Sequence, residues 1–259
     1  PHGRPEWVRG FIFNLRRPPF DDQRLREAVA LAFDADFINR TLYRGEGKRI
    51  TSIFPNTELS GAAIPAALDR RAAMKRADAL LRESGWTVKG GTRMKDGRPL
   101  SFQILLANPA DEKSALAFSE GLKKLGIRVN IRTVDAAQFA GALASYDYDM
   151  VLHYWINTLS PGTEQMVYWS CDAARNPGSR NYSGVCDPAV DAAALAIASA
   201  HDRRQLVESA RDLDRRIMEK TLFVPLFTIG RDYWAYWNSL EHPAKEPLYG
   251  SVLESWWQR

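Results

Sequence analysis

Alternating strand-like and helix-like segments in the middle of the chain constrain the fold more than any other feature of the sequence. Segments 100–107, 127–134 and 148–155 are short and rich in β-branched, aromatic and aliphatic residues, so each predicts a strand. Segments 112–126 and 136–145 predict helices. Strands joined through single helices by short connections form parallel sheets with right-handed crossovers. The sequence therefore predicts an α/β fold with a mixed, mainly parallel sheet flanked by helices, and such sheets bind ligands at the carboxyl ends of their strands.

Strand and helix patterns also flank this region. Residues 9–15 alternate and predict a strand, which Pro18 and Pro19 end. Asp21 or Asp22 can cap the helix that follows. Further expected elements are helices over 35–43, 69–85, 188–200 and 203–220, a surface loop over 45–68, a hairpin turn at Lys95-Asp96-Gly97, and final strands over 222–230 and 232–238.

Composition places the chain among ordinary globular proteins. Its 259 residues are 45% hydrophobic and 25% charged, which is not the balance of a disordered chain. The net charge of +4 is spread out, and the basic runs at 69–76 and 214–220 contain interleaved acids, so they predict solvated helix faces and no nucleic-acid contact. No apolar stretch approaches the ~18–20 residues that span a bilayer. The start of the chain, Pro1 to Gly10, resembles no signal peptide and lacks Met, so we expect a processed product or an excised fragment.

The chain has two cysteines, Cys171 and Cys186, on either side of a loop rich in Gly, Pro and Asn. Without a third or fourth ligand nearby, this pair is a poor zinc site. In an oxidising compartment a disulfide would close the loop and contribute about 3 kcal/mol. Two unpaired thiols are the alternative.

Motifs for catalysis are not evident in the sequence. The histidines are scattered, and no Gly-x-Ser-x-Gly, Walker, Gly-x-Gly-x-x-Gly or HExxH motif occurs. Asp147 and Asp149 lie at the start of a predicted strand, opposite the expected ligand end, whereas a glycosidase needs two acids that converge on one cleft. We therefore predict no catalytic residue, no metal and no cofactor. A hydrolytic α/β enzyme that uses Asp147 or Glu164 is the alternative.

The segment 153–165, HYWINTLSPGTEQ, lies where the last of the three parallel strands opens into a loop. His153, within the strand, predicts a hydrogen-bonded structural histidine. The loop mixes aromatic rings with Asn, Thr and Ser, and such mixtures line pockets for flexible polar ligands. This end of the sheet is therefore the expected binding region.

Residues 13–34, FNLRRPPFDDQRLREAVALAFD, resemble the motif that opens the second lobe of the large peptide-type solute-binding proteins of ABC importers. That motif reads Asn-x-x-x-x-Pro-x-x-Asp-x-Arg-x-Arg-x-Ala, and this chain fills it in order with Asn14, Pro19, Asp22, Arg24, Arg26 and Ala28. Further agreement, in the order of the family, covers 77–86, 95–106, 122–132, 146–155 and 181–192. Segment 159–169 and the terminal Trp256-Trp257 resemble the subgroup associated with microcin C uptake.

The resemblance implies a type II periplasmic-binding-protein-like fold and, because family members are roughly twice this long, only its C-terminal lobe. We expect residues 1–15 to contain the hinge strand, with Phe13 and Asn14 in the hinge, and a remnant of lobe one. Residues 16–238 are then lobe two, and residues 239–259 a tail that returns toward lobe one. The missing N-terminal lobe and the permease membrane subunits of an ABC importer are the implied partners.

The function implied by the resemblance is capture of oligopeptides or peptide-like compounds in the bacterial periplasm by closure of two lobes. A protein-interaction module is a further alternative. The expected ligand wall comprises Tyr154, Trp155, Asn157, Thr158, Leu159, Ser160 and Glu164. In that wall Trp155 would pack on a ligand side chain, and Asn157 and Thr158 would supply hydrogen bonds.

One departure from the family concerns the α-ammonium group of the ligand. Some peptide binders carry Trp-x-x-Asp at this place, and the carboxylate holds the amine. This chain reads Trp155-Ile156-Asn157-Thr158, so that salt bridge is missing. Either another acid substitutes, with Glu164 the nearest candidate, or the ligand amine is blocked or absent.

Overall fold

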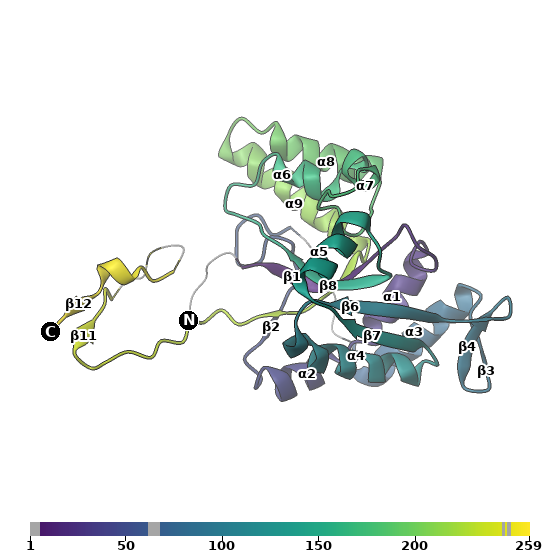
Figure 1. Cartoon of the computed structure of the whole chain (residues 1–259). Helices are drawn as coiled ribbons and strands as arrows, with labels where there is room; N and C mark the ends of the chain where they lie inside the picture. Colours follow the sequence, from purple (N-terminus) through teal and green to yellow (C-terminus); the bar gives the residue numbers. More distant parts are fainter. Residues whose placement is uncertain (1–5, 62–67, 245–246, 248–249) are drawn as a thin grey trace.

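A five-stranded sheet forms the centre of the structure, a computed structural model that describes residues 6–61, 68–244, 247 and 250–259 (Figure 1). The strands lie in the order β7-β6-β8-β1-β9. β6 runs parallel to β7 and β8, whereas β1 runs antiparallel to its neighbours β8 and β9. Four strands therefore point the same way, and the mixed, mainly parallel sheet is confirmed. The bounds are β1 (Val8–Phe13), β6 (Ser101–Leu106), β7 (Arg128–Thr133), β8 (Met150–Trp155) and β9 (Phe223–Pro225).

We call the edge where β6, β7, β8 and β9 end, and where β1 begins, the carboxyl edge of the sheet. The opposite edge is the amino edge. As expected, single helices connect the parallel strands: α4 (Glu112–Lys124) lies between β6 and β7, and α5 (Ala136–Ser145) lies between β7 and β8. The carboxyl edge therefore exists as predicted, and β1 and β9 extend it beyond the predicted strands.

Helices cover both faces of the sheet (Figure 1). One face carries α1 (Gln23–Leu31), α3 (Arg70–Glu83) and α4, and α2 (Ala35–Leu42) contacts α4. The other carries α5, α6 (Glu164–Trp169), α7 (Cys171–Arg175), α8 (Pro188–Ala198) and α9 (Arg203–Glu219). No helix in the described part of the chain has both the length and the apolar composition of a membrane crossing.

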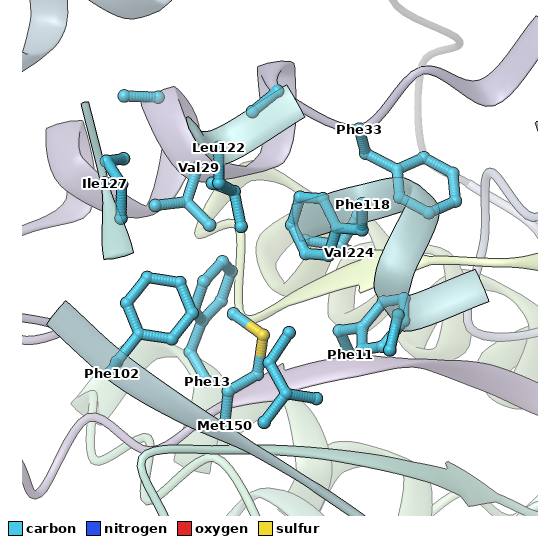
Figure 2. Close-up of a cluster of buried hydrophobic side chains, with 14 of the residues drawn as sticks. Phe11, Phe13, Val29, Phe33, Phe102, Phe118, Leu122, Ile127, Met150 and Val224 are labelled. Carbon is cyan, nitrogen blue, oxygen red and sulfur yellow. The ribbon is translucent and has the colours of Figure 1, made fainter. Parts of the chain in front are cut away.

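The central strand β1 supplies side chains to both hydrophobic cores. Phe11 and Phe13 enter the first core, whereas Val8 and Ile12 enter the second, as alternation along a strand requires. Figure 2 shows the first core, in which β1 meets residues from α1, α4, β6, β8 and β9, together with Phe33 after α1 and Ile127 before β7. The residues from the five elements are Val29, Phe102, Phe118, Leu122, Met150 and Val224.

Local signals placed several elements correctly. The Asp22 side chain accepts a hydrogen bond from the Arg24 N–H and caps α1, as predicted. The predicted hairpin turn joins β4 (Thr92–Lys95) to β5 (Arg98–Pro99), and β3 (Thr87–Lys89) pairs with β4. Asp96 and Gly97 both have positive φ, at 50° and 75°, which a type I′ turn requires.

The prediction of a strand at 232–238 is wrong. Among the described residues no strand lies beside this segment, so its backbone has no pairing partner. The strand expected at 222–230 is divided into β9 and β10 (Phe227–Thr228), and β10 pairs with β2 (Lys48–Arg49). After β10 the chain leaves the sheet and runs to β11 (Leu240–Glu241), a 3-10 turn at Leu253–Ser255 and β12 (Trp257–Gln258), which lie apart from the helices and sheet (Figure 1).

Gly10 allows β1 to approach β9 closely. A Cβ atom there would lie 2.6 Å from the Val224 carbonyl oxygen and 2.7 Å from Phe223 Cδ2. We predict that Gly10→Ala destabilises the fold by about 1–3 kcal/mol, because backbone cannot yield as a side chain can. Urea unfolding measures the change.

Gly141→Ala is the matched control, since a Cβ on this exposed glycine of α5 would meet no atom within 4 Å. That variant should match the parent or gain up to about 1 kcal/mol from helix propensity. Equal stability of the two variants would contradict the close approach.

Candidate functional site

An exposed aromatic pair lies at the carboxyl edge. Trp7, just before β1, stacks on Tyr154 of β8 with ring centroids 4.6 Å apart and an interplanar angle of 19°. Trp7 is 55% exposed and Tyr154 is half-buried. Exposed, mutually stacked rings offer a firm apolar surface with polar ends. We call Trp7 and Tyr154 the aromatic platform.

Charged and polar side chains connect the strand ends around the platform. The Arg9 guanidinium Nη2 lies 2.5 Å from Asp111 Oδ2, which joins β1 to the 3-10 turn Pro109–Asp111 after β6. The Thr133 hydroxyl donates to Glu112 Oε1 at 2.6 Å and joins β7 to α4. The carboxyl edge is thus a surface assembled from three strand ends.

His153 is packed among aromatic rings. Its ring lies 4.7 Å from Tyr154, 4.7 Å from Tyr182 and 5.6 Å from Phe139, measured between centroids. Burial lowers the His153 pKa from 6.5 to about 4, and nearby arginine charges add to the shift. The ring is therefore neutral at neutral pH. It is structural as expected, but within the described part of the chain aromatic packing surrounds it instead of the expected hydrogen bonds.

Trp155 lies in the second core instead of on the surface of the carboxyl edge. Its side chain is 2% exposed and packs on Trp169 and Phe223, with ring centroids 4.8 Å and 5.5 Å away. The indole N–H donates to the Arg180 carbonyl at 3.1 Å. This placement does not fit the expected contact with a ligand side chain. Successive residues of a strand face opposite ways, so Tyr154 is the residue that meets Trp7.

The Asn157 amide is also committed to the fold. Its Nδ2 donates to the Ile53 carbonyl at 2.6 Å, and its Oδ1 accepts from Gln165 Nε2 at 2.8 Å. The Gln165 Oε1 in turn accepts from the Trp169 indole at 3.1 Å. This buried chain of hydrogen bonds fixes the loop after β8 to α6 and leaves Asn157 only 6% exposed.

The remaining predicted wall residues after β8 lie in the same loop, except Glu164, which begins α6; Leu159 and Glu164 are half-buried. Thr158 and Ser160 are exposed, and the Thr158 hydroxyl accepts from the Ser160 N–H at 3.2 Å. The Leu159 carbonyl accepts from Arg203 at 2.5 Å. The Glu164 carboxylate accepts from the Gly162 N–H at 2.9 Å, so it shapes the turn before α6.

The expected hinge residues lie at the amino edge, far from the platform. Phe13 is in the first core. Asn14 is fully buried and donates to the carbonyls of Tyr146 and Tyr148 at 3.0 Å and 2.9 Å, so it fixes the end of β1 to the segment before β8.

The two cysteines, Cys171 and Cys186, form a disulfide. It joins the first residue of α7 to the segment just before α8. The bond therefore closes the loop between these helices, outside the carboxyl edge.

The acids considered for catalysis do not converge. Asp147 and Asp149 lie at the amino edge, where Arg17 pairs with them at 2.6 Å and 3.4 Å. Glu164 lies beyond the other end of β8. No cluster of three or more metal-ligating side chains occurs in the described residues. A cavity of about 710 Å³ at the amino edge is lined by the turn after β1 and the β4–β5 hairpin, without His or Cys.

Comparison with known proteins agrees with this architecture. Residues 2–177 match the family described as bacterial extracellular solute-binding proteins, family 5, middle region. A putative binding protein of Brucella suis biovar 1 is 37% identical over 287 aligned residues, which cover 98% of this chain and 47% of that protein. A probable peptide-binding protein, YejA, of Agrobacterium fabrum is 31% identical, with 96% and 46% covered. The chain spans about half the length of these relatives.

Solved structures support the same fold. The oligopeptide-binding protein AppA of Bacillus subtilis, solved with a nonapeptide, superposes with a TM-score of 0.77 at 21% identity, covering 99% of this chain and 51% of that one. NikA from Brucella suis, solved with Fe(III)-EDTA, gives 0.73 at 24% identity, covering 86% and 45%. The fold is therefore that of type II periplasmic binding proteins. The chain belongs to family 5 of the bacterial extracellular solute-binding proteins.

We predict that Asn157→Ala destabilises the protein by about 2–4 kcal/mol. The Ile53 carbonyl and the Gln165 amide would both lose a buried partner, and each unsatisfied group costs about 1–3 kcal/mol. Thr158→Ala, one residue away and exposed, should stay within about 0.5 kcal/mol of the parent. If urea unfolding shows the two variants to be equally stable, Asn157 does not have the structural role described.

Proposed function

We propose that this chain is one lobe of a receptor that captures peptides or peptide-like compounds outside the cytoplasm and delivers them to the permease subunits of an ABC importer. The observation that carries the proposal is the exposed aromatic platform at the carboxyl edge. Support comes from relatives whose names include a probable peptide-binding protein and from AppA, solved with a nonapeptide. NikA, solved with Fe(III)-EDTA, shows that the same fold also holds other solutes.

In this proposal a second lobe supplies the opposite wall of the binding cleft. The chain covers about half of its relatives, and lobes of such proteins close on ligand by hinge motion. The chain enters β1 at the carboxyl edge, and after β10 it leaves the lobe at the same edge. We therefore place the hinge at Trp7–Val8 and after Thr228, and not at Phe13–Asn14. Residues 239–259 would then contact the other lobe.

The ligand wall is revised from the expected set according to burial. Trp7, Tyr154, Thr158, Leu159 and Ser160 can contact a ligand, because each is exposed or half-buried near the end of β8. The other three expected residues stabilise the loop below this surface through hydrogen bonds within the protein: Trp155, Asn157 and Glu164. With no carboxylate at Thr158, the proposed ligand lacks a free α-ammonium group at this wall.

A binding role without catalysis is part of the proposal. The family consists of binding proteins, and the three acids considered for hydrolysis are divided between opposite edges of the sheet. Location in the periplasm and membership of the microcin C subgroup are likewise proposed, from the family description and from the 159–169 segment. The alternative of a protein-interaction module is less well supported. The exposed aromatic residues at 233–237, which could contact a partner protein, follow directly after the proposed hinge and can instead contact the second lobe.

We predict that replacing both platform residues, Trp7→Ala and Tyr154→Ala, weakens peptide binding by the full-length protein about tenfold or more, because the stacked surface is lost. Calorimetry with a peptide retained from a synthetic pool measures the change. Val88→Ala is the control, since Val88 is 51% exposed on β3, remote from the carboxyl edge (Figure 1). Unchanged affinity in the double variant would remove the platform from the binding site.

A further inference from the structure

Arg49, on β2, carries a guanidinium group for which the described part of the chain supplies no acceptor. Its Nη1 is enclosed by protein atoms and makes no hydrogen bond. Among the described residues no carboxylate pairs with it, and the Tyr43 hydroxyl is the titratable group that affects its pKa. An arginine presents five donors in a planar fork and nearly always has carboxylate, phosphate or carbonyl partners when buried. An unsatisfied buried donor therefore requires an explanation.

Two aromatic rings hold the Arg49 guanidinium in place. Its central carbon lies 4.4 Å from the Phe33 ring centroid and 5.5 Å from that of Phe227, and both phenylalanines are buried. Tyr43 stacks beside Phe227 at 4.9 Å. Ring faces attract the charge but accept no directed N–H bond, so the hydrogen-bonding capacity of the fork is unused. The side chain is thus fixed and still unpaired.

The position of Arg49 is at the carboxyl edge. Arg49 lies opposite Phe227 in the β2–β10 pair, just beyond the end of β9. The Leu226 N–H donates to the Arg9 carbonyl at 2.9 Å, and the Ile50 N–H donates to the Leu226 carbonyl at 3.0 Å, so Arg49 follows the same edge as Arg9. The charge of Arg9 is already offset by Asp111, at 2.5 Å. Of these two cations, Arg49 is the one for which the described residues supply no counter-ion.

Burial lowers the Arg49 pKa to about 9, so the group remains charged at neutral pH. A desolvated charge without a partner destabilises a fold, and replacing such a charge by an apolar side chain is often neutral or stabilising. Arg49 as a residue is half-buried, and Nη1 is the guanidinium nitrogen that is both enclosed and unbonded, so the rest of the group keeps some contact with solvent. A charged and unpaired guanidinium of this kind is suited to bind an anionic group when the ligand is present.

We infer that Arg49 binds a carboxylate of the captured peptide and so makes the ligand's free acid group a determinant of specificity. This inference rests on the proposed function. Planar bidentate pairing with carboxylate is the geometry that a guanidinium favours.

The test uses the full-length protein and a pool of synthetic tri- to hexapeptides without acidic side chains, with free and with acetylated amino termini, each made both as free acid and as C-terminal amide. Retained peptides are quantified by mass spectrometry. We expect the parent to retain the acids about tenfold more than the amides, and Arg49→Met to lose that preference. Arg49→Lys keeps the charge but lacks the planar guanidinium, so its preference for acids over amides should lie between those of the parent and Arg49→Met.

Lys48→Met is the matched control, since this neighbouring residue of β2 is exposed and faces the other side of the strand. It removes the same charge and should keep the preference for acids. If the parent retains no peptide of either kind, the proposed function itself fails. If the parent retains acids and amides equally, or if Arg49→Met keeps the preference, only the inference about Arg49 fails.

Thermal unfolding of the ligand-free full-length protein tests whether the role of Arg49 is purely structural. We expect Arg49→Met to unfold at the same temperature as the parent or higher, because the variant removes an uncompensated charge. A marked fall in unfolding temperature, together with an unchanged preference for acids, would mean that Arg49 pairs with an acid elsewhere in the protein, and would overturn the inference.

Discussion

The antiparallel insertion of β1 between β8 and β9 holds the sheet and its two helical layers together. This strand lies near the start of the chain, β8 lies in its middle and β9 lies near its end. The insertion requires Gly10 where the β9 backbone approaches, and Asn14 fixes its end to the segment before β8. Because β1 faces both cores, it holds the two helical layers to one sheet, and its amino end brings Trp7 to Tyr154.

Local patterns predicted the parts of the fold that local forces determine. The alternation over 100–155 gave the parallel strands and their helices, and Lys95-Asp96-Gly97 gave a turn whose backbone needs positive φ. The position of β1 could not be predicted, because strand order depends on pairings between distant segments. Residues 232–238 have strong strand propensity but no neighbouring strand, so tertiary context overrides the pattern.

The position of the carboxyl edge was predicted more accurately than the residues that are exposed on it. The carboxyl edge was expected from parallel topology, yet Trp155 and Asn157 face the interior. β8 is covered on both faces, so its sequence does not reveal which residues point outward. Trp7 and Arg49 were missed, since one precedes a strand whose partner was unknown and the other lay in a turn-rich stretch expected to be surface loop.

We propose that the carboxyl edge of this sheet is the ligand-facing wall of a two-lobe receptor. Hydrogen–deuterium exchange on the full-length protein, with and without a retained peptide, can decide this. Backbone amides at residues 7–9 and 153–160 should exchange more slowly when peptide is bound, because closure removes them from solvent. Slower exchange confined to residues 95–101, which line the cavity at the amino edge, would place the ligand at the wrong end of the sheet and contradict the account.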